Sequence, residues 1–504
     1  IFMNLWEDTE VFRDELGSVY ATIQQNGFRK TLPIQSSEVK GYLQYKYHAL
    51  CEAYISHQAM LPFLQTLETK ARMEGPTYEV FTRIGKCDRA IYVDLGNDRG
   101  EVVKITPRGW EVITDPPVRF VRSSIMKALP VPQSGGSLSQ LRPFLNVATD
   151  DEFNLILAAI LEMYHVGTPK PILNFQGNHG SAKSTRAKII VELVDPTKMP
   201  LRSQPKREDD LMIAGKGVWV LAFDNMSAIP GWLSDALCRL STGGGISKRR
   251  LYTDTDEVVI SLIRPVILNG IAECAMRPDL LDRIVNVPTH PIPESARKDE
   301  ETLWQEFEAV RPGILGAIFD VLAAILRNIG SVRLDKKPRM ADFARWVTAG
   351  EERLGWNLGR FIDLYTANIE ETVASRLEGD PIVEGLMQLL EGMNPWEGST
   401  TELLEAVSRQ ASETVKRGKG WPTSSKALSN TLHRLAPTLE SIGIQVEFPT
   451  GSKWDADRKS SIRKIRVFKK EGKKDRVDRE DREDQKYVEN ESDRAWASAL
   501  GLTD

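Results

Sequence analysis

The chain has 504 residues, 41% of them hydrophobic, with a formal net charge of −4. This length predicts several cores and more than one domain, and the small net charge means that nucleic-acid binding must depend on local basic patches. Its four cysteines are scattered and form no zinc spacing with the six histidines, which argues against a metal scaffold and favours a reducing compartment. No signal peptide or apolar run of membrane-span length is apparent, and the start at Ile1 suggests a fragment or a processed form.

The first third of the chain predicts an N-terminal α+β domain. Residues 1–35 are interpreted as a linker or a truncated upstream segment, and residues 36–137 as a collar or oligomerisation domain. Helical periodicity between Ser36 and Ala71 assigns Tyr42, Tyr45 and Tyr54 to core packing rather than to base stacking. Short alternating segments separated by turn residues then predict a small sheet over residues 80–120.

A glycine-rich segment, GNHGSAKST, follows the apolar run PILNF and predicts a phosphate-binding loop between a buried strand and a helix. In this interpretation Lys183 reaches the β- and γ-phosphates of ATP, and the Ser184 hydroxyl holds Mg²⁺. The pattern departs from the usual one, because Ala182 stands where glycine precedes the lysine. The predicted ATP-binding residues are Gly177, Asn178, His179, Gly180, Ser181, Ala182, Lys183, Ser184 and Thr185.

Two later apolar segments predict further strands of the same sheet. The run from Val218 to Phe223 indicates a central strand that brings Asp224 beside the loop, where its carboxylate completes the Mg²⁺ shell. The segment RPVILNG brings Asn269 to the same edge, where its amide can orient the attacking water. This core is predicted to occupy residues 138–295.

A hairpin is predicted between these two strands, in the segment STGGGISKRRLYTDTDEVVISLI. Lys248, Arg249 and Arg250 lie at its start and can grip DNA phosphates in the pore of a ring. The alternative is that they form ion pairs with the acidic residues of an adjacent subunit.

The segments GNHGSAKST, LAFDNMS, RPVILNGIAE, RPDLLDR and PRMADFARW together resemble the AAA+ ATPases of superfamily 3 helicase type that phages and mobile elements encode, often beside primases. The resemblance implies a ring, expected to be a hexamer, that uses ATP and Mg²⁺ to move on DNA in the cytoplasm of a bacterial or phage-infected host. Ring-forming ATPases project an arginine into the neighbouring subunit's site, and Arg283 is preferred here over Arg277. A primase is a candidate partner.

One departure concerns the catalytic base, because Asn225 stands where many AAA+ proteins have a second carboxylate. Glu208, Asp209, Asp210 or Glu257 can supply the base, or these acids are simply solvated charges.

The remainder of the chain predicts a helical lid over residues 296–390, a winged-helix domain over 391–470 and a charged, disordered tail over 471–504. Arg339 is the candidate lid arginine that senses the γ-phosphate, and Arg345 is an alternative. Arg339 can instead be an ordinary surface charge at the end of a helix. The winged helix can bind DNA or protein. Its candidate DNA-binding residues are Lys426, Arg434, Lys453 and Arg463.

The sequence therefore predicts an α/β protein with an AAA+ P-loop core, a helical lid, an N-terminal α+β domain and a C-terminal winged helix. The predicted function is an ATP-dependent DNA helicase or translocase that hydrolyses ATP at subunit interfaces. A loader or initiator ATPase that recruits replication proteins is the alternative, and an antiviral sensor ATPase is a third.

Overall fold

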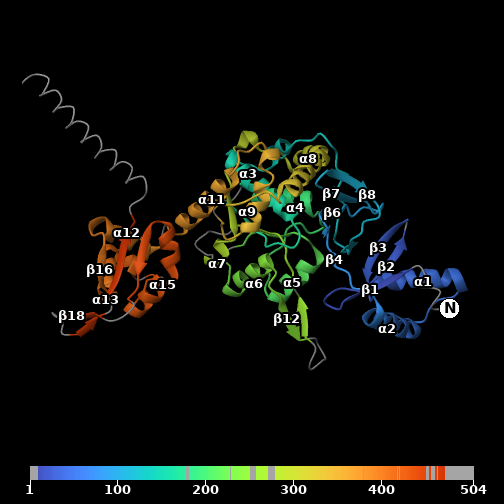
Figure 1. Ribbon diagram of the computed structural model, residues 1–504, viewed down its shortest axis with the longest axis horizontal. Helices are drawn as coiled ribbons and strands as arrows, with labels where there is room; N and C mark the ends of the chain where they lie inside the picture. The colour runs from blue at the N-terminus through green and yellow to red at the C-terminus, as the bar shows by residue number, and fades with distance from the viewer. Residues whose placement is uncertain are drawn as a thin grey trace, which may run out of the picture. The chain divides into compact units, whose positions relative to one another are not determined.

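The computed structural model describes residues 9–25, 27–177, 181–226, 229–249, 257–260, 262–270, 278–335, 337–377, 380–416, 418, 421–449, 453–455, 460–462 and 464–470. The chain divides into two compact units between Ile369 and Glu370 (Figure 1). The predicted disordered tail over 471–504 lies outside the described residues.

The first unit begins with an antiparallel sheet of β1 (Glu10–Arg13), β2 (Val19–Gln25) and β3 (Phe28–Pro33). It packs with α1 (Ser37–Cys51) and α2 (His57–Glu74), whose N-caps are Ser36 and Ser56. Residues 10–33 thus form a sheet where the sequence interpretation placed a linker, because Val19, Ala21 and Ile23 alternate into this core.

The tyrosines of α1 and the loop after it differ from their expected position. Tyr45 and Tyr54 are 75% and 73% exposed, and Tyr42 is only partly buried. The buried face of α1 is instead formed by Val39 and Leu43, one helical turn apart.

A second N-terminal sheet lies between residues 80 and 120, where the sequence predicted it. It is a meander of β5 (Ile84–Cys87), β6 (Ala90–Asp94), β7 (Val102–Thr106) and β8 (Gly109–Ile113), beside the short parallel pair β4 (Val80–Phe81) and β9 (Arg119–Phe120). Trp110 of β8 donates its indole N–H to Asp320 Oδ1 at 2.9 Å, which joins this sheet to helix α8 (Glu300–Asn328).

The centre of the first unit is a parallel sheet of β10 (Ile172–Gln176), β11 (Leu221–Phe223), β14 (Val266–Asn269) and β15 (Ile284–Pro288), in the spatial order β11-β14-β10-β15. The accompanying helices and the hairpin are η2 (Leu138–Phe144), α3 (Asp150–Met163), α4 (Lys183–Val194), α5 (Glu208–Gly217), α6 (Gly231–Thr242), β12 (Ile246–Arg249), β13 (Glu257–Ile260) and α7 (Pro278–Leu281).

Two details of this sheet correct the sequence interpretation. The strand that carries Asp224 is an edge strand rather than a central one, although all three of its residues are buried. The segment RPDLLDR precedes the strand β15 instead of following the last strand of the core. The predicted hairpin is present as β12 and β13, and Figure 1 shows it extending away from the sheet beyond α5 and α6.

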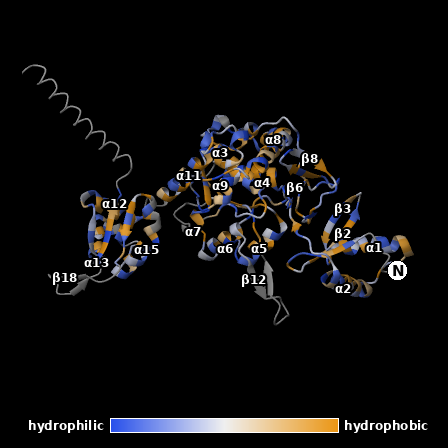
Figure 2. Ribbon diagram, in the orientation of Figure 1, coloured by the Kyte–Doolittle hydropathy of each residue, from blue (hydrophilic) through white to orange (hydrophobic). Residues whose placement is uncertain are grey.

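The helices that follow are η4 (Glu294–Ala296), α8 (Glu300–Asn328), α9 (Ala341–Thr348), α10 (Glu351–Leu354) and α11 (Arg360–Leu377). By length and composition, α8 is apolar enough to cross a membrane, which the sequence interpretation did not anticipate. Its most apolar stretch is 67% buried inside the unit, as in the core helix of a globular domain. Figure 2 shows hydrophobic residues, coloured orange, along α4 and α8.

The second unit contains α12 (Pro381–Gly392), β16 (Trp396–Ser399), α13 (Thr400–Gln410), α14 (Glu413–Lys416), α15 (Ser425–Ser441), β17 (Ile444–Glu447), β18 (Lys453–Asp455), β19 (Ser460–Ile462) and β20 (Lys464–Lys469). Its antiparallel sheet has the order β16-β20-β17. Helix α12, which the sequence interpretation assigned to the lid, packs into this core through Ile382, Val383 and Leu386.

Candidate nucleotide-binding site

The predicted phosphate loop joins the end of β10 to the start of α4. Gly177 has a φ of +150°, and a Cβ at this position would lie 2.0 Å from Thr289 Oγ1, so only glycine fits. The Thr289 hydroxyl in turn donates to the Gln176 carbonyl at 2.6 Å and lies 2.9 Å from Ser181 Oγ. The end of β15 therefore braces one side of the loop.

Ala182 stands where the usual pattern has glycine, and its backbone conformation shows why glycine is common there. Its φ of +58° is left-handed, the conformation that glycine adopts without strain, and this residue is the N-cap of α4. An L-residue pays about 1–2 kcal/mol for that conformation. Position 182 thus has the backbone conformation that a glycine would adopt there, at the cost of strain in one residue.

Lys183 follows at the first position of α4. Its Nζ donates to the Gly177 carbonyl at 2.7 Å, so the side chain folds back across the loop. Burial lowers the pKa of Lys183 below its ordinary value, while the nearby Asp224 carboxylate opposes this shift.

Ser184, Asp224 and Asn269 come together at the carboxyl edge of the sheet. The Ser184 hydroxyl lies 3.0 and 2.9 Å from the two oxygens of Asp224, and the Asn269 amide donates to Asp224 Oδ1 and, at 3.3 Å, to Ser184 Oγ. These residues come from α4, the end of β11 and the end of β14, so three separate elements build the cluster.

The cluster fits a magnesium ion by its donor set. A hydroxyl and a carboxylate are the hard oxygen ligands that Mg²⁺ prefers. The Oδ1 atom of Asn269 is buried without a hydrogen-bond partner, so it can accept a bond from a water molecule or a ligand.

Arg283 lies at the other end of the same sheet. Its carbonyl accepts the Ile172 N–H at 2.7 Å, at the amino end of β10, while the phosphate loop leaves the carboxyl end. The five residues of β10 separate these two ends by about 13 Å. The Arg283 guanidinium donates to the Asp279 carbonyl and lies 3.6 Å from Cys238 Sγ.

Arg339 is beside Arg283 and not at its own loop, which differs from the position expected of a γ-phosphate sensor. Its guanidinium donates to Asp282 Oδ2 at 2.6 Å and lies 4.0 Å from Asp279. These carboxylates hold the arginine at the amino end of the sheet. The alternative residue, Arg345, donates to the Ile329 carbonyl at 2.7 Å.

Two of the candidate base residues are held by arginines. Glu208 pairs with Arg239, and Asp210 lies 3.4 Å from Arg207. Asn225, in the place of the usual second carboxylate, has a φ of +55°, which asparagine tolerates better than most residues. Its N–H donates to Asp224 Oδ1 at 2.9 Å and so helps to orient that carboxylate.

Sequence reasoning missed a second group of residues around the loop. Asn146 donates to the carbonyls of Ser181 and His290 at 3.2 and 2.7 Å, and buried Arg186 of α4 donates to the Pro288 carbonyl at 3.1 Å. Burial lowers the pKa of Arg186 to about 10. The bonds to His290 and Pro288 join segments more than 100 residues apart, so no local pattern could have revealed them.

Several predicted site residues lie outside the described residues or have side chains that are not described. The residues outside the described ranges are Asn178, His179, Gly180, Arg250, Arg277 and Arg463. For Lys248, Arg249, Glu257 and Lys453 only the backbone is described, in strands β12, β13 and β18.

In the second unit, Lys426 and Arg434 are exposed on α15. His433, between them, stacks on Phe448 with ring centroids 3.6 Å apart, which ties this helix to the segment after β17. The exposed Lys464 begins β20.

The described residues thus bring Ser184, Asp224 and Asn269 together beside Lys183 at the carboxyl edge of the parallel sheet. Two family models match the chain: the actinomycete integrative conjugative element replication protein over residues 138–361, and the RepA C-terminal domain of the same elements over residues 382–479. Over these two segments the chain is therefore similar to the replication protein of integrative conjugative elements.

No curated protein matches the chain. Among solved structures, the C-terminal region of NrS-1 is similar with a TM-score of 0.42 and 12% identity, covering 92% of this chain and 98% of that one. A JCV helicase is similar with a TM-score of 0.25 and 16% identity, covering 47% and 65%. At these TM-scores the likenesses do not establish a shared fold.

Proposed function

We propose that this chain is a ring-forming, ATP-dependent DNA helicase or translocase that serves the replication of a bacterial mobile element. The observation that carries the proposal is the convergence of Ser184, Asp224 and Asn269 beside Lys183 at one edge of a parallel sheet. The match to a replication-protein family of integrative conjugative elements supports the biological role.

Each residue of the cluster has a role in this proposal. Lys183 moves from the Gly177 carbonyl to the β- and γ-phosphates, and the amides at the start of α4 hold the same groups. Ser184 and Asp224 hold Mg²⁺, which neutralises charge on the phosphates when bound. The buried Asn269 orients the water that attacks the γ-phosphate.

Arg283 is proposed to act in the site of a neighbouring subunit. Its position about 13 Å from the loop end of its own strand β10 supports this role, because it does not reach its own site. The proposed ring is a hexamer in the cytoplasm that surrounds single-stranded or forked DNA, with a primase as a candidate partner.

DNA contacts are proposed for the hairpin β12–β13 and for the second unit. The element order α12, β16, α13, α14, α15, β17 and β20, with the sheet order β16-β20-β17, supports a winged helix whose exposed α15 residues Lys426 and Arg434 face a duplex backbone.

A subunit-mixing experiment tests the proposal. We expect Lys183→Ala to abolish ATP hydrolysis and Arg283→Ala to reduce it strongly, whereas a mixture of the two variants regains turnover at interfaces that combine one intact loop with one intact arginine. Retained ATP hydrolysis in Lys183→Ala would refute the assignment of the hydrolytic site to the loop at Lys183. A mixture with no recovery would refute the action of Arg283 between subunits.

A loader that binds DNA and recruits replication proteins is the second candidate, and Asn225 in place of a second carboxylate favours it because hydrolysis is then slow. Strand displacement on forked DNA separates the two candidates. A motor needs continuous turnover and displaces the strand, whereas a loader binds the fork with ATP and leaves the duplex intact.

A further inference from the structure

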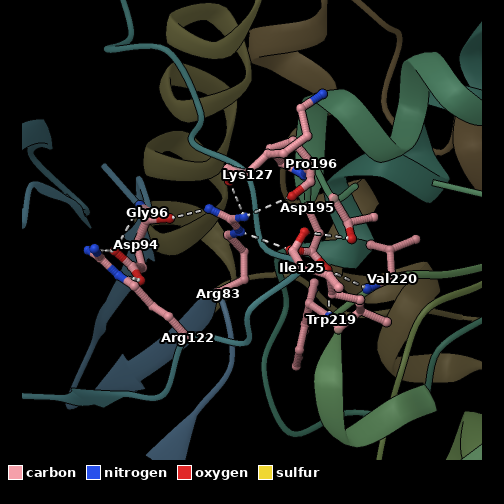
Figure 3. Close-up of polar contacts among 12 residues, drawn as sticks. Arg83, Asp94, Gly96, Arg122, Ile125, Lys127, Asp195, Pro196, Trp219 and Val220 are labelled. Atoms are coloured by element: carbon pink, nitrogen blue, oxygen red, sulfur yellow. Dashed lines mark hydrogen bonds and ion pairs between the residues drawn. The ribbon is translucent and has the colours of Figure 1, made fainter. Parts of the chain in front are cut away.

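Arg83, in the turn between β4 and β5, is buried in the first unit with an exposed fraction of 0% (Figure 3). Its guanidinium donates to Asp195 Oδ1 at 2.9 Å and to the carbonyls of Asp94, Lys127 and Pro196 at 2.9, 2.7 and 3.1 Å. One side chain of the N-terminal sheet therefore binds four separate groups, two of them in the segment that follows α4.

Asp195 connects this arginine to the nucleotide site. It is the C-cap of α4, the helix that begins with Lys183 and Ser184. Its second oxygen, Oδ2, accepts the N–H groups of Trp219 and Val220 at 2.6 and 3.2 Å, immediately before β11 (Figure 3). The Asp195 carboxylate thus joins the C-terminal end of α4 to the start of β11, the strand that is followed by Asp224.

The chain beyond Asp195 reaches the other end of β11. Pro196 accepts the Lys127 N–H at 2.9 Å, and Arg202 pairs with the outer edge of the strand. There the Asp224 N–H donates to the Arg202 carbonyl at 2.9 Å. The segment from Asp195 to Arg202 therefore contacts both ends of β11, and Arg83 binds the first two residues of that segment.

The surroundings of Arg83 are closely fitted. Gly96 has a φ of +67°, and a Cβ there would lie 2.9 Å from Arg83 Nη1. The neighbouring Asp94 accepts from Nε and Nη2 of Arg122 at 2.8 and 2.7 Å, and it accepts the Gly96 N–H at 3.0 Å. Such a bidentate pair fixes direction as well as distance.

We propose that Arg83 and Asp195 are positioning residues that set the distance between Ser184 and Asp224 and so determine magnesium binding. This inference rests on the proposed ATPase function. The N-terminal sheet is then part of the nucleotide-binding unit, because its arginine orients the strand that carries the carboxylate. An ion pair that only adds stability would change the melting temperature and leave the metal site unchanged.

The test measures metal binding separately from turnover in the full-length protein. Calorimetry with ADP, with and without Mg²⁺, gives the factor by which the metal tightens nucleotide binding. We expect Arg83→Met to reduce this factor about tenfold, with metal-free ADP affinity within twofold of wild type. Hydrogen exchange at the Trp219 and Asp224 amides should accelerate together. Arg83→Lys, which retains one bond to Asp195, should recover part of the effect and serves if Arg83→Met fails to fold.

The matched control is Lys170→Met, which breaks another buried ion pair of the same unit. It should lower the melting temperature while the magnesium factor stays at the wild-type value. Equal loss of the magnesium factor in Lys170→Met, or a wild-type factor in both Arg83 variants, would overturn the inference. Failure of the proposed function looks different, because the wild type itself would then hydrolyse no ATP and would show no effect of magnesium on ADP binding.

Discussion

The two units of this protein bury different chemistry. The first unit encloses charged side chains, among them Arg83, Lys170, Arg186 and Glu162 at 0 or 1% exposure. Among the described residues of the second unit none of the buried side chains is charged, and its core consists of residues such as Leu386, Leu403 and Leu432. Buried ion pairs add little net stability, so a buried charge such as Arg83 matters mainly for the groups that it holds in place, here Asp195.

The largest expected effect comes from breaking a buried pair in the first unit. Lys170 lies 3.1 Å from Glu162, and burial, which alone would raise the pKa of Glu162, is outweighed by the charges of Lys170 and His165, which lower it. Lys170→Met leaves the buried Glu162 carboxylate without its main opposite charge. We therefore expect the unfolding free energy of the first unit, measured by calorimetry, to fall by about 3–5 kcal/mol.

The double variant Lys170→Met with Glu162→Gln serves as the control for that prediction. It removes both charges and should recover most of the lost stability. A double variant as unstable as the single one would contradict the view that an uncompensated charge causes the loss.

The second prediction concerns the apolar core of the second unit. Leu432 of α15 is fully buried, so Leu432→Ala should lower the unfolding free energy of this unit by about 2–5 kcal/mol. Calorimetry should show a shift in one transition only, with DNA-free ATP hydrolysis retained. Leu358→Ala is the control, because this leucine is 89% exposed and its removal should change neither transition.

A smaller effect is expected on the surface of α15. Lys426→Ala with Arg434→Ala removes two exposed cations, which should weaken DNA binding about tenfold at low salt and reduce the slope of log affinity against log salt by about 2. Fluorescence anisotropy at several salt concentrations measures both quantities. Lys70→Ala, an exposed lysine on α2 of the first unit, is the matched control, and an equal loss there would contradict a specific role for α15.

The smallest effect concerns a buried carboxyl group of the first unit. Burial raises the pKa of Glu351 above its ordinary value of 4.5, although the N–H groups of Phe361 and Gly359 oppose the shift. Stability from a raised pKa is fully present below the unfolded-state value and is lost as pH rises through the folded-state value. The unfolding free energy of wild type relative to Glu351→Gln should therefore increase as pH falls from about 7 to about 4.5. A difference that is independent of pH would contradict this sign.

The candidate site shows how far local patterns extend. The loop around Lys183 and the polar residues Asp224 and Asn269 could be predicted because each follows a short apolar run, and parallel strands deliver their carboxyl ends to one edge. The position of Arg339 could not be predicted in this way. Its partner Asp282 is 57 residues distant, and only the packing of the lid brings the two together.

The sequence by itself determined the buried strands that end beside Asp224 and Asn269, the inserted hairpin and the presence of a small N-terminal sheet, because all of these depend on neighbouring residues. Tertiary structure alone decided that residues 10–33 form a sheet, that β11 is an edge strand and that Arg83 meets Asp195 across 112 positions. The physical reason is that a buried charged side chain pairs with a group that lies near it in the folded chain. Periodicity along the sequence does not encode that proximity.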